Sequence, residues 1–191
     1  MYLLPGLSPE KIPVIRTERF TLRVGKLSDF TRMHEMWQMP DYFKHVGNQP
    51  RAPGYNWAQI QKNIGSWALF GYGYWTIAEA DTDAYMGECG FTLSKRAEIH
   101  PALKDIPEAG WGIRPEYWGS GITKSAMKAA LNWAQEQDPA FPFQCIINDD
   151  HRASEAVARS LGMSIARTVA YDGNADDQVN VWENVTAARA S

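Results

Sequence analysis

Hydrophobic and polar positions change period along the first third of the chain. Alternation over Arg19–Val24 predicts a half-buried strand. Helical spacing that begins after Asp29 predicts a helix, and Pro40 ends it. Glycines and prolines make Phe43–Tyr55 an expected ordered loop, with Asn56 as the expected cap of a second helix. A strand followed by two helices is therefore expected here.

The middle of the chain returns to period two. Tyr74–Ala80 and Tyr85–Leu93 predict an antiparallel hairpin, because two β-rich runs flank a short polar stretch. Glu98–Pro107 has no clean period and is expected to be a loop. Glu108–Ile113 is a short apolar strand with glycines, and helical spacing then predicts a helix over Ile122–Gln137.

The last third predicts one helix among strands. The strands are expected over Phe143–Ile147, Ser164–Tyr171 and Gln178–Glu183. Apolar spacing from Ala153 to Leu161 predicts the helix, closed by Gly162 in a left-handed conformation. Asp172-Gly173-Asn174 is an expected turn. The order of elements predicts an α/β chain with a mixed sheet, folded as one domain over residues 1–191 with residues 1–16 as a lead-in.

Composition narrows the class of protein. With 191 residues, 45% of them hydrophobic, the chain is expected to bury one core. A net charge of −3 without a dense basic run makes nucleic acid an unexpected partner. The N-terminus has no basic segment followed by a long apolar one, and no window resembles a membrane span. We therefore expect a cytoplasmic protein without a membrane partner.

Sulfur and imidazole groups do not suggest a metal site. Cys89 and Cys145 each lie in an apolar, strand-like stretch and are expected to be reduced core residues. No spacing brings two histidines onto one face of an element, so no metal is expected. The four histidines are His34, His45, His100 and His151.

The sequence WGSGITKS, Trp118–Ser125, resembles a phosphate-binding loop. A Walker loop ending at Lys124-Ser125 would need glycines where Trp118 and Thr123 stand. A dinucleotide fingerprint starting at Gly119 would need glycine in place of Lys124. A helix N-terminus whose unpaired amides could bind a diphosphate remains, as does a tight turn without a ligand.

Four stretches in this order resemble the GCN5-related N-acetyltransferase (GNAT) superfamily, in the branch that includes the ribosomal-protein N-terminal acetyltransferases. They are Thr17–Arg23, Gly87–Phe91, Glu108–Gly121, and His151 through Met163. The resemblance covers nearly the whole chain from Thr17. It implies a mixed, mostly antiparallel central sheet flanked by helices, with a splayed pair of strands that holds the cofactor.

The resemblance also implies acetyl-CoA as the cosubstrate. Its pyrophosphate is expected on the residues at the start of the helix, and its pantetheine arm along the preceding strand. Glu116 replaces the usual Gln or Arg of the family's loop, which costs little because backbone groups make the contacts. Lys124 could assist the 3′-phosphate or be solvated. The implied contacts are Trp118, Gly119, Ser120, Gly121, Ile122 and Thr123 for the pyrophosphate, and Trp111, Gly112 and Ile113 for the arm.

Two departures from the family's pattern affect the catalytic residues. His151 replaces the asparagine that helps to hold the pantetheine arm, so that contact is in doubt. Ala158 replaces a tyrosine that often serves as general acid. By resemblance Ser154 then becomes the first candidate near the thiolate, and a purely structural role in the first turn of its helix is the alternative.

The reaction also needs a base and an acceptor pocket. Glu108 is the first candidate base and Glu88 the second, and bulk water with surface side chains is the alternative. An acyl-cysteine intermediate is not expected, because neither cysteine has a histidine beside it in sequence. Four aromatic side chains could line the pocket or belong to the core, namely Tyr42, Phe43, Tyr55 and Tyr72.

The expected function is transfer of an acetyl group to a primary amine by direct attack. The amine could belong to a protein N-terminus or to a small molecule, and an acyl group longer than acetyl stays possible. A non-catalytic acyl-CoA-binding module of the same fold and a nucleotide-binding protein are the alternatives. The chain could be a monomer or a homodimer.

Overall fold

A single eight-stranded sheet organises the molecule in a computed structural model, which describes residues 4–44, 46–47, 49–94, 106–171 and 174–184. The strand order is β1-β2-β3-β4-β5-β6-β8-β7, and only the β5–β6 pair is parallel. The strands are β1 Ile15–Arg16, β2 Phe20–Arg23, β3 Tyr74–Glu79, β4 Tyr85–Thr92, β5 Glu108–Ile113, β6 Gln144–Asn148, β7 Ser164–Tyr171 and β8 Asn174–Glu183. This confirms the expected mixed, mostly antiparallel sheet.

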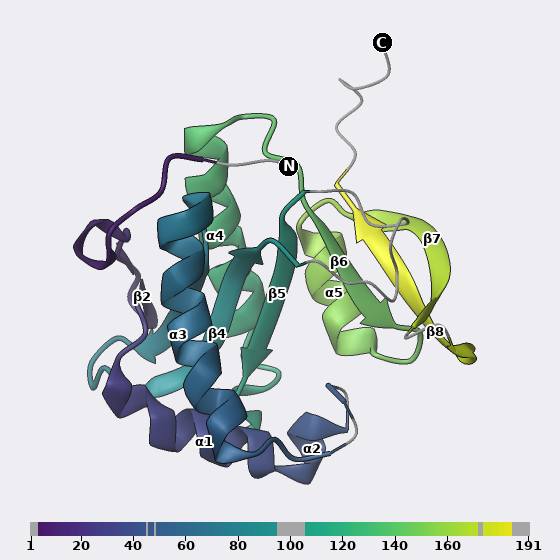
Figure 1. Ribbon diagram of the computed structural model, residues 1–191, viewed down its shortest axis with the longest axis horizontal. Helices are drawn as coiled ribbons and strands as arrows, with labels where there is room; N and C mark the ends of the chain where they lie inside the picture. Colours follow the sequence, from purple (N-terminus) through teal and green to yellow (C-terminus); the bar gives the residue numbers. More distant parts are fainter. Residues whose placement is uncertain (1–3, 45, 48, 95–105, 172–173, 185–191) are drawn as a thin grey trace.

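Helices cover both faces of the sheet (Figure 1). One face carries α3, with α1 and α2 across its lower end, and the other carries α4 and α5. The helices are α1 Phe30–Gln38, α2 Pro40–Phe43, α3 Pro53–Phe70, α4 Ile122–Gln137 and α5 Arg152–Ser160. In the part of the chain that the structure describes, no helix is long and apolar enough to cross a membrane.

The main core lies between the sheet and α4. Ala126, Ala130 and Ala134 recur on one side of α4 and are fully buried, so the helix approaches the sheet closely. Trp67 and Trp75 have ring centroids 4.5 Å apart. Trp133 of α4 lies 5.2 Å from the first ring and 5.3 Å from the second, so this aromatic cluster joins α3, β3 and α4.

Most predicted elements agree with the structure to within a few residues, and the helix over Ile122–Gln137 agrees at both ends. Gly162 follows α5 with φ +76°, the expected left-handed conformation. Most of the predicted loop Glu98–Pro107, and two of the three residues of the turn at 172–174, lie outside the described residues.

The predicted cap at Asn56 is wrong. The helix begins at Pro53, whose fixed φ favours the first helical position. Asn56 lies one turn inside the helix, is fully buried, and its Nδ2 is 2.8 Å from His34 Nδ1. Its polar group thus links α3 to α1 rather than capping α3.

The expected lead-in contributes to the fold. Ile15 and Arg16 form β1, and they pair with Leu22 and Thr21 of β2. The strand is only two residues long, which is too short for an alternation of polar and apolar residues to predict it. It forms because β2 provides the backbone hydrogen bonds.

Candidate active site

The sheet opens between β5 and β6. Their pairing is confined to Glu108 and Gln144, at the start of both strands. Figure 1 shows the two strands diverging from there, with β5 on the side of β4 and β6 on the side of β8. This is the splayed pair that the resemblance implies. The remainder of β5 therefore leaves backbone N–H and C=O groups on this edge free of a strand partner.

A cavity of about 640 Å³ lies at this opening. Its wall contains six of the side chains or backbone positions that the sequence singles out, which are Glu88, Glu108, Trp111, Gly112, His151 and Ser154. Tyr42 and Tyr55 also line it, which is one of the two places that the sequence left open for them. Tyr72 is instead a fully buried core residue. Phe43 ends α2 and does not line the cavity.

The glycine-rich turn lies at the start of α4, outside the cavity wall. Gly119 and Gly121 have φ of +71° and +80°, a region that favours glycine. No atom lies within 4 Å of a Cβ built on either residue, so the surface above the turn is open. The first amides of α4 point toward this end, because a helix leaves them without intrahelical partners. Lys124 is exposed beside them.

Substituting Gly121 by valine (G121V) is expected to weaken CoA binding at least about tenfold while the fold is retained. The left-handed conformation costs a β-branched residue roughly 1–2 kcal/mol, so the turn relaxes and its amides move. Gly65 on α3 also has open space at its Cβ, but without a positive φ, so G65V is the matched control. Calorimetric titration with CoA measures the difference. Equal affinity in folded G121V and G65V would contradict the role of the turn.

Ser154 and Trp111 meet across the opening. The indole Nε1 of Trp111 donates to Ser154 Oγ at 3.3 Å. The same Oγ is 3.5 Å from His151 Nε2, at the edge of hydrogen-bond range. Ser154 is thus held by a side chain of β5 and faces the cavity, although it also belongs to the first turn of α5. Ala158, where the family often has tyrosine, is fully buried in the core.

Glu88 is a buried acid in the cavity wall. Only 6% of the residue is exposed, and Asn63 Nδ2 of α3 donates to its Oε2 at 3.0 Å. Burial raises the pKa of Glu88 to about 7, although Asn63 and Lys62 act in the opposite direction. A carboxyl group with this pKa can take and give a proton near neutral pH.

A β-bulge aims Glu88 into the cavity. The register of β3 and β4 slips between Ile77 and Ala78, leaving Met86 as an extra residue on β4. Tyr85 and Glu88 are three apart, which places side chains of a regular strand on opposite faces. Here both face α1 and α3, while Met86 packs in the core of the other face. Hydrophobic patterning alone gives no signal for such a slip.

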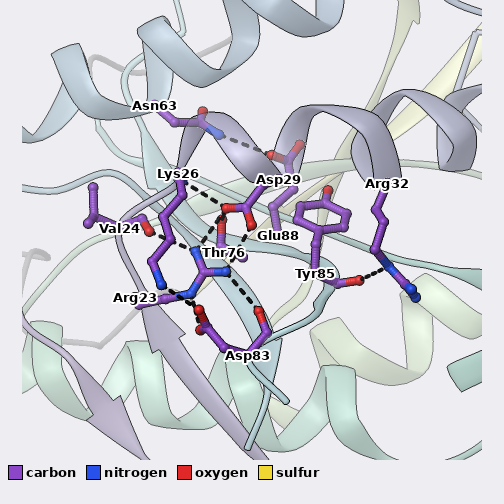
Figure 2. A network of polar contacts seen from close by, with 10 residues as sticks. All are labelled: Arg23, Val24, Lys26, Asp29, Arg32, Asn63, Thr76, Asp83, Tyr85 and Glu88. Atoms are coloured by element: carbon purple, nitrogen blue, oxygen red, sulfur yellow. Dashed lines mark hydrogen bonds and ion pairs between the residues drawn. The ribbon is translucent and has the colours of Figure 1, made fainter.

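A buried ion pair and a second, half-exposed one hold the hairpin that carries Glu88. The guanidinium of Arg23 makes two 2.8 Å bonds to Asp29, and its Nε bonds Asp83 in the β3–β4 turn at 2.5 Å. Thr76 Oγ1 of β3 donates to Asp29 at 3.2 Å. Figure 2 shows this network beside the Asn63–Glu88 pair. Since both Arg23 and Asp29 are buried, removing one of these two would leave the other as an uncompensated charge, whereas Asp83 is half exposed.

Glu108 occupies the other end of the same wall. It stands opposite Thr92 on β4, whereas Glu88 stands opposite Gly112. The two backbone positions are thus separated by four residues along β5, or about 13 Å. Glu108 lies where β5 and β6 are still paired, and Glu88 lies beside the open part of the strand.

Two tyrosine hydroxyls pack against the glycines of β5. A Cβ built on Gly112 would lie 2.2 Å from the Tyr42 hydroxyl, and one on Gly110 would lie 1.7 Å from that of Tyr74. The sequence suggests close backbone approach for these glycines, and the structure identifies the approaching groups. Burial, then the charge of Glu88, raises the pKa of Tyr42 far above its ordinary value. Its hydroxyl therefore stays protonated and can donate a hydrogen bond beside Glu88.

Both cysteines are free and buried, as the sequence predicts. Cys145 contributes to the cavity wall, but burial and the charge of Glu108 raise its thiol pKa well above the ordinary value. Burial does the same for Cys89. The thiolate needed for an acyl-cysteine is therefore disfavoured. Among the described residues, no group of three metal-ligating side chains forms; His45 and His100 lie outside them.

Known proteins share this architecture. A solved acetyltransferase from Agrobacterium tumefaciens has 24% identity and a TM-score of 0.76, with 92% of this chain and 96% of that chain covered. A ribosomal-protein-S5-alanine acetyltransferase from Vibrio fischeri has 15% identity and a TM-score of 0.67, with 91% and 96% covered. A ribosomal L7/L12 alpha-N-protein acetyltransferase solved with coenzyme A has 16% identity and a TM-score of 0.68, with 92% and 99% covered.

Structural similarity at these identities shows a common fold. The sequence itself also matches a family model, described as the acetyltransferase (GNAT) domain, over residues 19–164. The match extends from Arg19, just before β2, to Ser164, the first residue of β7. It therefore includes all of the residues that line the cavity except Tyr171 of β7 and Val179 of β8. The chain therefore belongs to the GNAT acetyltransferase family.

Proposed function

We propose that the protein is an acetyl-CoA-dependent N-acetyltransferase that acts on a primary amine. The observation that carries the proposal is Glu88, a buried acid with a pKa of about 7 in a cavity beside the open edge of β5. Membership of the acetyltransferase family and the coenzyme A bound to a structural neighbour support it.

The open part of the site suits the two halves of acetyl-CoA. The backbone groups of β5 at Trp111–Ile113 that lack a strand partner match the amides of a pantetheine arm, which would lie between β5 and β6 as an added strand. The carbonyl of Ile113 already accepts from Trp118 Nε1 at 2.9 Å. The glycine turn before α4 presents amides and the positive end of the helix dipole to a pyrophosphate. No other charged group is needed there, and exposed Lys124 is free to reach the 3′-phosphate or water.

Glu88 is proposed as the general base. An amine in the cavity must lose a proton before or during attack, and the carboxylate of Glu88 accepts it directly or through one water. The amine nitrogen forms a bond to the acetyl carbon, and the bond from that carbon to sulfur breaks. The carbonyl oxygen gains charge in between, which a free N–H on the edge of β5 stabilises.

The leaving thiolate needs a proton donor. Ser154 faces the opening between β5 and α5, on the side where a cosubstrate along β5 would place its sulfur. Tyr42, a buried hydroxyl over Gly112, is a second donor that the sequence connects only with the acceptor pocket. Glu108 lies too far along β5 to share the role of Glu88, and we assign it to the inner wall of the acceptor pocket.

A coupled assay tests the function. Thiol release from acetyl-CoA is followed over a panel of amino acids, polyamines and N-terminal peptides, and mass spectrometry identifies the acetylated nitrogen. We expect turnover with some primary amine. Tight CoA binding without turnover on the whole panel would favour the non-catalytic binding module, and affinity for ATP or NAD without affinity for CoA would favour a nucleotide-binding protein.

A further inference from the structure

An arginine lies against aromatic rings in the acceptor cavity. Arg51, in the segment between α2 and α3, places its guanidinium carbon 4.8 Å from the ring centroid of Tyr55 and 5.6 Å from that of Trp37. All three side chains line the cavity. A position over aromatic rings fixes a guanidinium while leaving the N–H groups in the plane of the guanidinium free to donate.

Arg51 has no carboxylate partner among the residues that the structure describes. Its Nε is buried and makes no hydrogen bond there, and its Nη2 reaches only the carbonyl of Val46 at 3.4 Å. The two most buried arginines differ, since Arg23 pairs with Asp29 and Arg114 pairs with Glu35 and Glu116. Arg51 as a whole is only partly buried and lines the cavity, so its guanidinium is open to a partner that enters the cavity.

The backbone beside Arg51 is shaped for the guanidinium. Gly47 has φ +115°, and a Cβ there would lie 2.6 Å from Arg51 Nη2. Any other residue would therefore push the guanidinium away from its position. The backbone of Arg51 is itself held, because Gln38 Nε2 donates to its carbonyl oxygen at 2.8 Å.

An aromatic wall connects Arg51 to the proposed base. Tyr42 packs its ring 5.1 Å from that of Trp37, and its hydroxyl lies over Gly112, the partner of Glu88 across the strands. The cavity thus has a cation at one end of this wall and an acid with a pKa of about 7 at the other. Lys62, also in the lining, adds positive charge on the same side as Asn63.

We propose that Arg51 binds a carboxylate of the acceptor, so that the acceptor is a primary amine that also carries a carboxylate. The inference rests on the proposed function, because it assigns the acceptor of the same site. The planar fork of arginine suits two parallel hydrogen bonds to a carboxylate, and the aromatic rings hold it in place. A free amino acid and a peptide with an acidic residue next to its N-terminus both offer this chemistry.

Matched acceptors separate the contribution of Arg51 from that of the amine. Initial rates are measured with amino acids and their carboxamides, and with peptides that carry Asp or Asn in the second position. We expect kcat/KM of the wild type to favour the carboxylate of each pair at least about tenfold. Arg51→Met should remove this preference through KM, with little change for the carboxamides. If the preference is seen with the amino acids but not with the peptides, the acceptor is a free amino acid. If it is seen with the peptides but not with the amino acids, the acceptor is a peptide.

Two further variants control for charge and stability. Arg51→Lys keeps the charge but loses the fork, and should recover only part of the preference. Arg159→Met removes another arginine stacked on an aromatic ring, 5.2 Å from Trp182, outside the cavity, and should keep the wild-type preference. Thermal unfolding confirms that each variant is folded.

A binding measurement keeps this inference separable from the proposed function. Calorimetry with CoA present compares the carboxylate ligands on wild type and Arg51→Met. Loss of carboxylate binding in the variant supports the role of Arg51 even if no amine turns over, in which case only the proposed function fails. Turnover and binding that are equal for both members of each pair, and unchanged in Arg51→Met, would overturn the inference and leave the acetyltransferase intact.

Discussion

Replacing Glu88 by glutamine (E88Q) is expected to lower kcat/KM for acetyl transfer at least about 100-fold, the lower end of the range for losing a general base. The amide retains the size of the carboxyl group and can still bond Asn63, but it cannot accept the proton of the amine. CoA affinity should be unchanged, because Glu88 lies on β4 and not on the β5 edge or the glycine turn. Initial rates and calorimetry measure the two effects.

The pH profile gives this prediction a second readout. Since the base must be deprotonated, kcat/KM of the wild type should fall as pH drops through about 7, the pKa of Glu88. E88Q should lack this limb. A residual rate that keeps the same pH dependence would show that another group titrates, and would contradict the assignment.

The stability of the wild type should change with pH in the direction opposite to its activity. The folded state raises the carboxyl pKa from 4.5 to about 7, so it binds the proton more tightly than the unfolded state and loses stability as pH rises through this interval. At about 1.4 kcal/mol per pKa unit, the charged form costs roughly 3 kcal/mol. E88Q should therefore be at least as stable as wild type at pH 8, and urea unfolding tests this.

Glu108→Gln is the matched control for the activity of E88Q, with an expected loss of activity below about tenfold. A loss larger than that of E88Q would move the base to Glu108.

Replacing Gly112 by alanine (G112A) is expected to destabilise the protein by about 1–3 kcal/mol, the usual cost of overpacking. The new Cβ would lie 2.2 Å from the Tyr42 hydroxyl, so the tyrosine must move away from Glu88 and the open edge of β5. Because small displacements of an active site can cost about 100-fold in rate, acetyl transfer should also fall steeply. Urea unfolding and initial rates measure both effects.

Removing the hydroxyl should relieve the clash. In G112A/Y42F the nearest remaining ring atom is the Cζ at 3.2 Å, a contact that a shift of a few tenths of an ångström accommodates. G110A/Y74F is the contrasting pair, since the Tyr74 Cζ would still lie 2.8 Å from the new Cβ. Stability should thus return in the first double variant and not in the second. A fully stable G112A alone, or a G112A/Y42F no more stable than G112A, would show that Tyr42 does not lie over this glycine.

Local patterns were sufficient to predict most of the fold. The helix Ile122–Gln137 has strong apolar spacing, a glycine before it and Asp138-Pro139 after it, so both of its ends were predictable. The glycine turn was also predictable, because glycine permits the positive φ that Gly119 and Gly121 adopt.

The arrangement of the cavity could not be predicted in the same way, because it depends on contacts between distant elements. Burial beneath α3 raises the pKa of Glu88 against the opposing effect of Asn63, and the bulge that aims Glu88 leaves no mark on the hydrophobic pattern. The sequence alone therefore favours Glu108 over Glu88 as the candidate base. It singles out Arg51 only as an arginine within a loop rich in glycine and aromatic residues.

Asn56 shows how tertiary contacts override a local preference. An asparagine before an apolar periodic run is typical of a helix cap, but Pro53 starts the helix earlier and His34 provides the partner for the amide. The competing signal, proline at a first helical position, was present in the sequence at the same place.

A crystal structure with CoA and an acetylated acceptor product tests the central claim most directly. We expect the pantetheine arm between β5 and β6, the pyrophosphate on the amides of the glycine turn and the first turn of α4 that have no backbone partner, and the sulfur near Ser154 and Gly112. The acceptor nitrogen should lie within about 3 Å of the Glu88 carboxyl group or be joined to it by one water. CoA bound away from the opening between β5 and β6, or an acceptor nitrogen beside Glu108 and out of reach of Glu88, would contradict the account.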